Sequence, residues 1–144
     1  MRVLLDTIVL VSHLLTSERA GAIATIFDAL GNGEFVLLVP LPLLDELDRV
    51  VTQKPRLARY IQPEQLAALR GILLDIGEVV PPINGVLPIV SRDRKDDYLL
   101  AYAVVGEADY VVTGDEDLLV LKRLDKLQIL SPPAFAALLR DKES

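Results

Sequence analysis

Residues 89–121 read IVSRDRKDDYLLAYAVVGEADYVVTGDEDLLVL, and this stretch mixes strongly apolar runs with carboxylates. Five of its six aspartates lie in or beside the predicted turns and helix starts: Asp93, Asp96, Asp97, Asp115 and Asp117. A folded domain normally keeps carboxylates in water, because burying an unpaired charge is costly. Placing these acids on predicted helices and strands therefore separates ordinary surface charges from candidates for a site.

The first half of the stretch predicts a helix that carries Asp96 on its apolar face. Spacings of three, four and seven residues put Asp96 on one side with Leu99, Leu100 and Ala103. Asp93 lies on the same side if the helix extends back that far, and Asp97 lies off the centre of the face. Tyr98 and Tyr102 take the other side, where we expect them to serve packing or dimer contacts.

The second half predicts a short strand followed by a turn. Residues 110–113 (YVVT) are aromatic and β-branched, Gly114 ends the run, and Asp115 opens the next helix. Asp96 and Asp115 are thus two inward-leaning acids at the ends of elements, which is the pattern of a site.

The composition of the 144 residues predicts one folded domain, residues 1–144, with 51% hydrophobic residues and a mean hydropathy of +0.38. There is no cysteine and one histidine, which excludes disulfides, thiolate metal sites and multi-histidine zinc sites. A bound metal would need oxygen ligands. No apolar run approaches the length of a membrane span, and Asp6 interrupts any signal-peptide core, so we expect a cytoplasmic protein without a membrane segment.

The net charge of −6 should not attract nucleic acid to the molecule as a whole. Two local clusters are basic although the chain as a whole is acidic: Lys54, Arg56 and Arg59 in one predicted loop, and Arg92, Arg94 and Lys95 beside the aspartates. The second cluster fits contacts to RNA phosphates and charge balance with the adjacent acids equally well.

Strands alternate with helices along the rest of the chain. The predicted strands are residues 2–6, 35–39, 110–113 and 128–130, with at most a short one near 79–82. The predicted helices are 9–15, 17–30, 41–51, 63–76, one near 96–103, and 133–140, the last preceded by Ser131 as its cap and Pro132. This order predicts an α/β fold with a mainly parallel sheet, in which ligands bind beyond the carboxyl ends of the strands. Asp6 and Asp115 both follow strands at that edge.

Helix 41–51 adds Glu46, which falls on the inward face formed by Leu43, Leu47 and Val50. Taken singly, each acid has a structural interpretation as a strand-end residue, a helix cap or a charge that extends past an apolar face. Four such acids on separate elements favour a site, because clustered carboxylates repel one another unless a cation lies among them. Divalent cations held by carboxylates promote phosphodiester hydrolysis.

On these residues the chain resembles the PIN-domain ribonucleases, particularly the VapC-like toxins of prokaryotic toxin–antitoxin pairs. The resemblance runs in order through 4–7 (LLDT), 44–47 (LDEL), 92–97 (RDRKDD), 108–118 (ADYVVTGDEDL) and 129–132 (ILSP). It implies a three-layer α/β/α PIN-like domain, metal-dependent cleavage of RNA, and an antitoxin that occupies the site.

The resemblance implies roles for individual residues. The catalytic, metal-binding acids would be Asp6, Glu46, Asp96 and Asp115, holding Mg²⁺ or Mn²⁺, with Asp117 as a further ligand. Thr113 would orient through its hydroxyl, and Asp93 and Asp97 would be auxiliary. The helical wheel and the spacing to the downstream alanine both favour Asp96 over Asp97.

The sequence departs from the family pattern at Ile8, where the family usually has asparagine or serine. Isoleucine cannot hydrogen-bond an acid or a metal-bound water, so metal affinity and rate are expected to fall. This supports an alternative, a catalytically weakened PIN-like domain that acts as a protein- or RNA-binding module. A phosphotransfer domain with an aspartyl phosphate is a third interpretation, but it would favour an acid at position 8. Apolar helices and exposed tyrosines predict a homodimer, and His13 is expected on a helix surface or at a partner contact.

Overall fold

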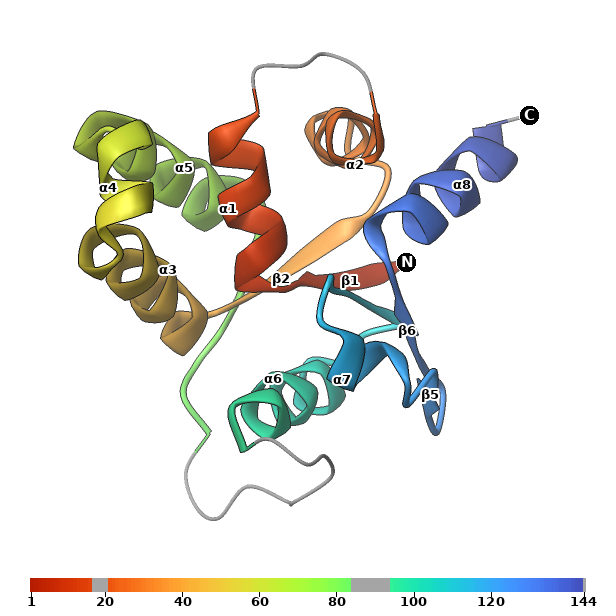
Figure 1. Ribbon diagram of the computed structural model, residues 1–144. Helices are drawn as coiled ribbons and strands as arrows, with labels where there is room; N and C mark the ends of the chain where they lie inside the picture. The colour runs from red at the N-terminus through yellow and green to blue at the C-terminus, as the bar shows by residue number, and fades with distance from the viewer. Residues whose placement is uncertain (17–20, 84–93, 144) are drawn as a thin grey trace.

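The computed structural model describes residues 1–16, 21–83 and 94–143, and residues 94–97 and 143 by their backbone alone. Its centre is a six-stranded sheet in the order β3-β2-β1-β4-β6-β5 (Figure 1). The strands are β1 (Arg2–Leu5), β2 (Val36–Pro40), β3 (Glu78–Val80), β4 (Tyr110–Val112), β5 (Arg123–Leu124) and β6 (Leu127–Leu130). All neighbours pair in parallel except β5 with β6, which confirms the predicted mainly parallel α/β sheet.

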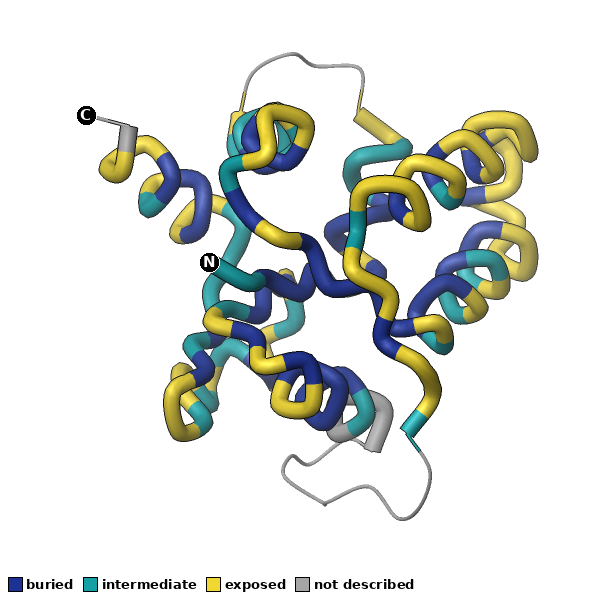
Figure 2. The backbone as a smooth tube through the Cα atoms, turned by 180° about the vertical axis from the view of Figure 1, so that it is seen from behind, coloured by how far each residue is buried: buried dark blue, intermediate teal, exposed yellow. Residues whose placement is uncertain are grey.

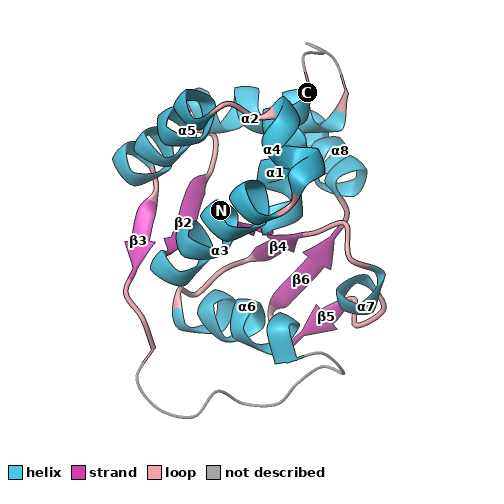
Figure 3. Ribbon diagram, turned by 60° about the vertical axis from the view of Figure 1, so that its left-hand side comes forward, coloured by secondary structure: helices cyan, strands magenta, loops and turns pink. Residues whose placement is uncertain are grey.

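Helices cover both faces of this sheet. They are α1 (Thr7–Leu15), α2 (Ala22–Gly31), α3 (Leu41–Gln53), α4 (Pro55–Tyr60), α5 (Pro63–Ile76), α6 (Arg94–Val105), α7 (Glu116–Leu119) and α8 (Pro132–Glu143). Helix α6 lies on one face, and α1, α2 and α8 lie on the other (Figures 1 and 3). None of the helices in the described parts of the chain is long and apolar enough to cross a membrane.

The continuous apolar runs of the central strands follow from this layering. Val3, Leu4 and Leu5 of β1 are buried, as are Val111 and Val112 of β4. A parallel strand with helices on both faces buries successive side chains rather than alternate ones. Buried positions therefore concentrate on the strands and the inner faces of the helices, with exposed positions outside them (Figure 2).

The strand order creates a crevice at one edge of the sheet. From β1 the chain moves outward through β2 and β3, and it then returns to the other side of β1 as β4. Leu5 pairs with Val112 at the carboxyl ends of β1 and β4. Ligands of open α/β sheets bind where the strand order reverses in this way.

Two elements differ from the sequence prediction. The basic segment expected as a loop contains α4, which begins at Pro55, a residue suited to the first helical turn. Leu57 and Ile61 are both buried and hold this short helix on the fold. Strand β5 was not predicted, because its two residues carry no periodic pattern and only pairing with β6 defines them.

The predicted helix faces were also partly wrong. Tyr102 is only 4% exposed, and its hydroxyl accepts a hydrogen bond of 2.8 Å from the Ile83 backbone N–H, so α6 buries a side that was expected to face outward. Ile76, expected on the inward face of α5, is 46% exposed because the helix ends there. Helix α2 begins at Ala22, and residues 17–20 of the predicted helix lie outside the described residues.

Candidate active site

Asp6 lies at the carboxyl end of β1 and caps α1. Its Oδ1 accepts a hydrogen bond from the Thr7 backbone N–H at 2.6 Å, and its Oδ2 accepts one from Thr113 Oγ1 at 2.7 Å. Capping by Asp6 also explains why the helix begins at Thr7, two residues before the predicted start. Both carboxylate oxygens of Asp6 are thereby fixed in direction.

Thr113 connects Asp6 to the next acid along the edge. Its side chain is fully buried directly after β4, and its Oγ1 accepts a hydrogen bond of 3.0 Å from the Asp115 backbone N–H while donating to Asp6. Asp115 in turn caps α7 by accepting from the Asp117 backbone N–H at 2.9 Å. One hydroxyl therefore links the strand-end acids of β1 and β4.

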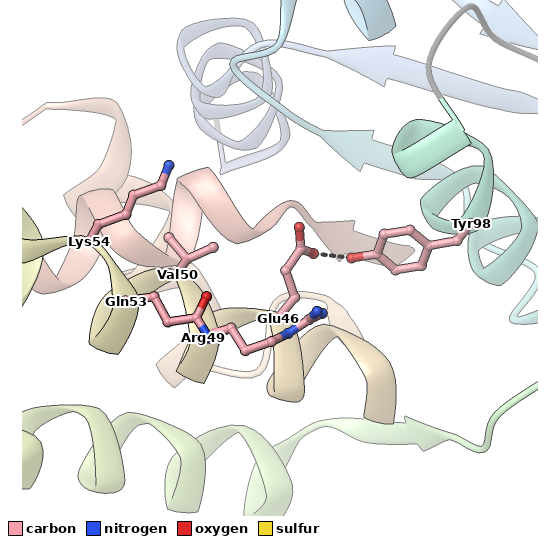
Figure 4. Close-up of a pocket in the computed structure, with 6 residues that line it drawn as sticks. All are labelled: Glu46, Arg49, Val50, Gln53, Lys54 and Tyr98. Carbon is pink, nitrogen blue, oxygen red and sulfur yellow. Dashed lines mark hydrogen bonds between the residues drawn. The ribbon is translucent and has the colours of Figure 1, made fainter.

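Glu46 reaches the same edge from α3. Its Oε2 accepts hydrogen bonds from Thr7 Oγ1 at 2.9 Å and from the Tyr98 hydroxyl of α6 (Figure 4). The predicted inward face is shifted, since α3 buries Leu44 and Val51 as well as Leu43 and Leu47, whereas Val50 is half-buried. Glu46 therefore stands at the border of the apolar face, with its carboxylate turned toward Asp6 and Tyr98 rather than into the core.

The electrostatics of these groups reflect their crowding. Burial raises the pKa of Asp6, the hydrogen bonds from Thr113 and Thr7 oppose this, and the negative charges of Glu46 and Asp115 raise the pKa further. The pKa of Tyr98 is raised by burial and then by its bond to Glu46, so its hydroxyl stays protonated and acts as a donor. Within the described residues, Asp6, Glu46 and Asp115 make no ion pair.

These acids border a cavity of about 490 Å³, which Thr7, Ile8 and Tyr98 also line. An all-oxygen donor set suits a hard divalent cation rather than a thiophilic metal. Among the side chains that the structure describes, no three acidic or histidine residues converge closely enough to hold an ion. The donor chemistry therefore fits a metal, but the described acids alone do not complete its coordination.

The structure brings together four of the residues singled out from the sequence: Asp6, Glu46, Thr113 and Asp115. Asp117 lies next to them, but its side chain is exposed and only its backbone takes part in the hydrogen bonding. The structure does not describe the side chains of the other candidates. The backbone of Arg94, Lys95, Asp96 and Asp97 forms the start of α6 with undescribed side chains, and Arg92 and Asp93 lie outside the described residues.

Two functional contacts were missed in the sequence. Thr7 donates to Glu46, and Tyr98, which was assigned to packing or dimer contacts, donates to the same carboxylate. The sequence did place Tyr98 off the apolar face of α6, which suggests a polar role for its hydroxyl. It could not identify Glu46 as the acceptor, because that requires knowing that α3 lies near α6.

Ile8 and His13 have clear positions. Ile8 is 54% exposed, lines the cavity beside Asp6, and lies next to Gly114, where an added Cβ would be 3.9 Å from its Cγ2. His13 stacks on Phe27 with ring centroids 3.8 Å apart, and burial lowers its pKa. His13 is thus a packed, half-buried side chain within the fold.

A parallel α/β sheet with acids from separate elements at its carboxyl edge places oxygen ligands where open α/β sheets bind their ligands. Comparison with known families matches residues 2–117 to the PIN domain, and the chain belongs to this family, whose members are nucleases. In fold it is similar to a chain in the crystal structure of VapBC2 from Rickettsia felis bound to a DNA fragment from their promoter. The two share 17% identity over 91% of this chain and 98% of that chain, with a TM-score of 0.59. No curated protein sequence matches.

Proposed function

We propose that this protein is a metal-dependent endoribonuclease that hydrolyses RNA phosphodiester bonds, and the carboxylate cluster around Asp6 is the observation that carries the proposal. Asp6 is held by two hydrogen bonds, while burial and the charges of Glu46 and Asp115 disfavour its ionised form. The burial of Asp6 and the repulsion between the neighbouring carboxylates destabilise the folded state. A cation bound between the acids would relieve this repulsion. Membership of the PIN domain family supports the same reaction class.

Mg²⁺ or Mn²⁺ would be held by Asp6, Glu46 and Asp115 together with Asp96 from α6, and Asp117 would be an additional ligand. Such a cation supplies an activated water and neutralises charge on the phosphate. Asp96 is preferred to Asp97 on the wheel argument, and Asp93 and Asp97 stay auxiliary.

The chain itself orients the acids. Thr113 holds Asp6 Oδ2, and Thr7 and Tyr98 both donate to Glu46 Oε2. Among the described side chains, Glu46 Oε1 has no further donor and would be open to a cation. Ligands held by such hydrogen bonds need less reorganisation when a cation binds. Tyr98 is also a neutral hydrogen-bond donor beside the negatively charged Glu46, because its raised pKa keeps the hydroxyl protonated.

The fold similarity to a VapBC2 chain supports a role as the toxin of a toxin–antitoxin pair. In this proposal an antitoxin protein covers the acid edge, free toxin cleaves cellular RNA in the cytoplasm, and two copies form a homodimer. Arg92, Arg94 and Lys95 are candidate RNA contacts.

Ile8 favours the second candidate, a weakened PIN-like domain that binds protein or RNA without efficient cleavage. Its apolar side chain is exposed in the cavity next to Asp6, where it offers no hydrogen bond. If Ile8 weakens the site, Ile8→Asn should raise metal affinity by up to about 10–100-fold, the range for an outer-shell partner. Unchanged affinity in a Mg²⁺ titration would show that position 8 has no such role.

The deciding experiment measures cleavage of labelled single-stranded RNA with Mg²⁺, with Mn²⁺ and with chelator. Wild type should cleave only with a divalent cation, and Asp6→Asn and Asp96→Asn should not cleave. Asp109→Asn is the matched control, because Asp109 lies at the opposite end of β4 and bonds the Arg2 backbone N–H. Absence of cleavage by wild type, or equal cleavage by wild type and the two site variants, would remove the nuclease proposal.

A further inference from the structure

The corner between α3 and α4 is basic in an acidic protein. Residues 49–63 contain no acid and include Arg49, Lys54, Arg56 and Arg59, although the net charge of the chain is −6. Arg49 lies on α3 as expected, whereas Lys54, Arg56 and Arg59 were expected in a loop. The structure places Lys54 between α3 and α4, and Arg56 and Arg59 on α4. A basic segment with a fixed backbone can bind at defined positions.

Lys54 marks the corner itself. Its backbone is extended, at φ −95° and ψ 109°, because the following Pro55 disfavours the helical conformation at this position. Pro55 then begins α4, and the buried Leu57 and Ile61 anchor that helix. The exposed Lys54 and Arg56 are therefore carried on a rigid turn.

The corner faces the acids across two adjoining cavities. Lys54 and Arg56 line the cavity of about 490 Å³ that Asp6, Glu46 and Asp115 border. Arg49 and Lys54 line a neighbouring cavity of about 380 Å³, which shares Glu46 and Tyr98 with the first (Figure 4). The space is thus lined both by these cations and by the candidate metal-binding acids.

Charge balance within the protein does not account for these cations. Neither Arg49, Lys54 nor Arg56 forms an ion pair with any residue in the described ranges, whereas Arg2 and Arg70 do so elsewhere. A polyanion approaching three carboxylates would be repelled, and cations that line the same space offset that repulsion. An acidic peptide would meet the same repulsion and would lack a phosphate for a metal held by the acids.

We propose that Lys54 and Arg56, with Arg49 beside them, bind the backbone phosphates of single-stranded RNA next to the bond placed at the acids. The proposal rests on the nuclease function above and adds the path of the substrate. Lysine and arginine contacts to phosphates position a strand without reading its bases. These residues would therefore govern affinity and leave sequence preference unchanged.

The test separates binding from cleavage by using the full chain with Asp6→Asn, Mg²⁺ present, and fluorescence anisotropy of a labelled single-stranded RNA. Adding Lys54→Ala or Arg56→Ala should raise Kd about fivefold at 0.1 M salt and reduce the slope of log K against log salt by about 0.7 for each lost phosphate contact. Lys54→Arg should restore the Kd. Arg59→Ala is the matched control on α4, because Arg59 is exposed and lines neither cavity.

In wild-type background, Lys54→Ala and Arg56→Ala should raise KM for RNA cleavage while kcat stays unchanged. Unaltered Kd in both variants would overturn the proposal even if the protein is a nuclease, as would an equal loss in Arg59→Ala. Tighter binding of a polyglutamate peptide than of RNA would also overturn it, in favour of an acidic protein partner. If RNA binds as expected but wild type never cleaves it, the result supports the RNA-binding surface, and the nuclease proposal fails.

Discussion

The two ends of the parallel sheet both gather charged side chains, but among the residues that the structure describes the ion pair lies at the amino end. There the Arg2 guanidinium pairs with Glu78 at the start of β3 and donates from Nε to the Gly106 carbonyl at 3.0 Å. The Arg2 backbone N–H donates to Asp109 Oδ2 at 2.7 Å, just before β4. Glu78 is thus paired with a cation, and Asp109 is bonded to the backbone of the same arginine, so the charges at this end are satisfied within the fold.

The carboxyl end carries Asp6, Glu46 and Asp115, and its described donors are hydroxyls and backbone N–H groups. Neutral donors orient carboxylates but do not cancel their charge. The pKa of Asp6 is raised by its burial, and the charges of Glu46 and Asp115 add to this. A fold tolerates such repulsion where a bound cation or a reaction makes use of it. The contrast between the ends predicts that substitutions at the carboxyl end change activity and that those at the amino end change stability.

Asp6→Asn should have the largest effect. The proposal makes Asp6 a direct metal ligand, so its loss should lower RNA cleavage by more than about 100-fold, above the range for an outer-shell partner. In chelator the same variant should unfold at a higher temperature than wild type, because the buried negative charge is gone. Cleavage assays and thermal unfolding measure both effects. A variant that loses activity together with thermal stability would show that Asp6 is only structural.

The stabilisation by Asp6→Asn should depend on pH in a defined direction. The pKa of Asp6 is raised above 3.8, so the folded state binds this proton more tightly than the unfolded chain does. The stability that protonated Asp6 contributes is present below pH 3.8 and is lost as pH rises through the raised pKa. The difference in unfolding temperature between variant and wild type should thus be small below pH 3.8, grow as the pH rises from there through the raised pKa, and level off above it. A pH-independent difference would contradict the assigned cause.

Thr113→Val should lower cleavage by about 10–100-fold, since it removes the hydroxyl that holds Asp6 and accepts from the Asp115 N–H. Thr113→Ser keeps the hydroxyl and should recover most of the rate. Thr52→Val serves as the control, because the exposed Thr52 hydroxyl donates to the Asp48 carbonyl of its own helix, α3. Equal activity of Thr113→Val and wild type would show that RNA cleavage does not require this hydroxyl.

The sequence predicts the order of strands and helices well, since buried parallel strands read as apolar runs. Asp6 and Asp115 follow from strand ends alone, but their closeness depends on β1 pairing with β4, which local pattern does not reveal. The same limit applies to Glu46, Thr7 and Tyr98, whose contacts require α3 and α6 to meet the end of β1. Helix α4 was missed because tertiary burial rather than periodicity defines it. The assignment of residues 1–144 to one domain stays a prediction.

Tyr98→Phe is expected to have a smaller effect, about 3- to 10-fold on kcat, because Glu46 keeps its second donor, Thr7. The pKa of Tyr98 is raised, so its ionisation should not appear in the rate profile at alkaline pH. Tyr60→Phe is the matched control, since Tyr60 is strongly exposed. Identical rates for both variants and wild type would show that Thr7 alone orients Glu46.

Glu78→Gln tests the other end of the sheet and should give the smallest change. Its ion pair with Arg2 is partly exposed, so its loss should reduce the free energy of unfolding by about 0.2–1 kcal/mol and less at high salt. RNA cleavage should not change, because Glu78 lies at the amino end of β3, away from the acids. Glu64→Gln, at an exposed position in the first turn of α5, controls for the general loss of one negative charge. A loss of cleavage in Glu78→Gln comparable to that in Thr113→Val would break the contrast, since charge neutralisation would then no longer separate structural acids from functional ones.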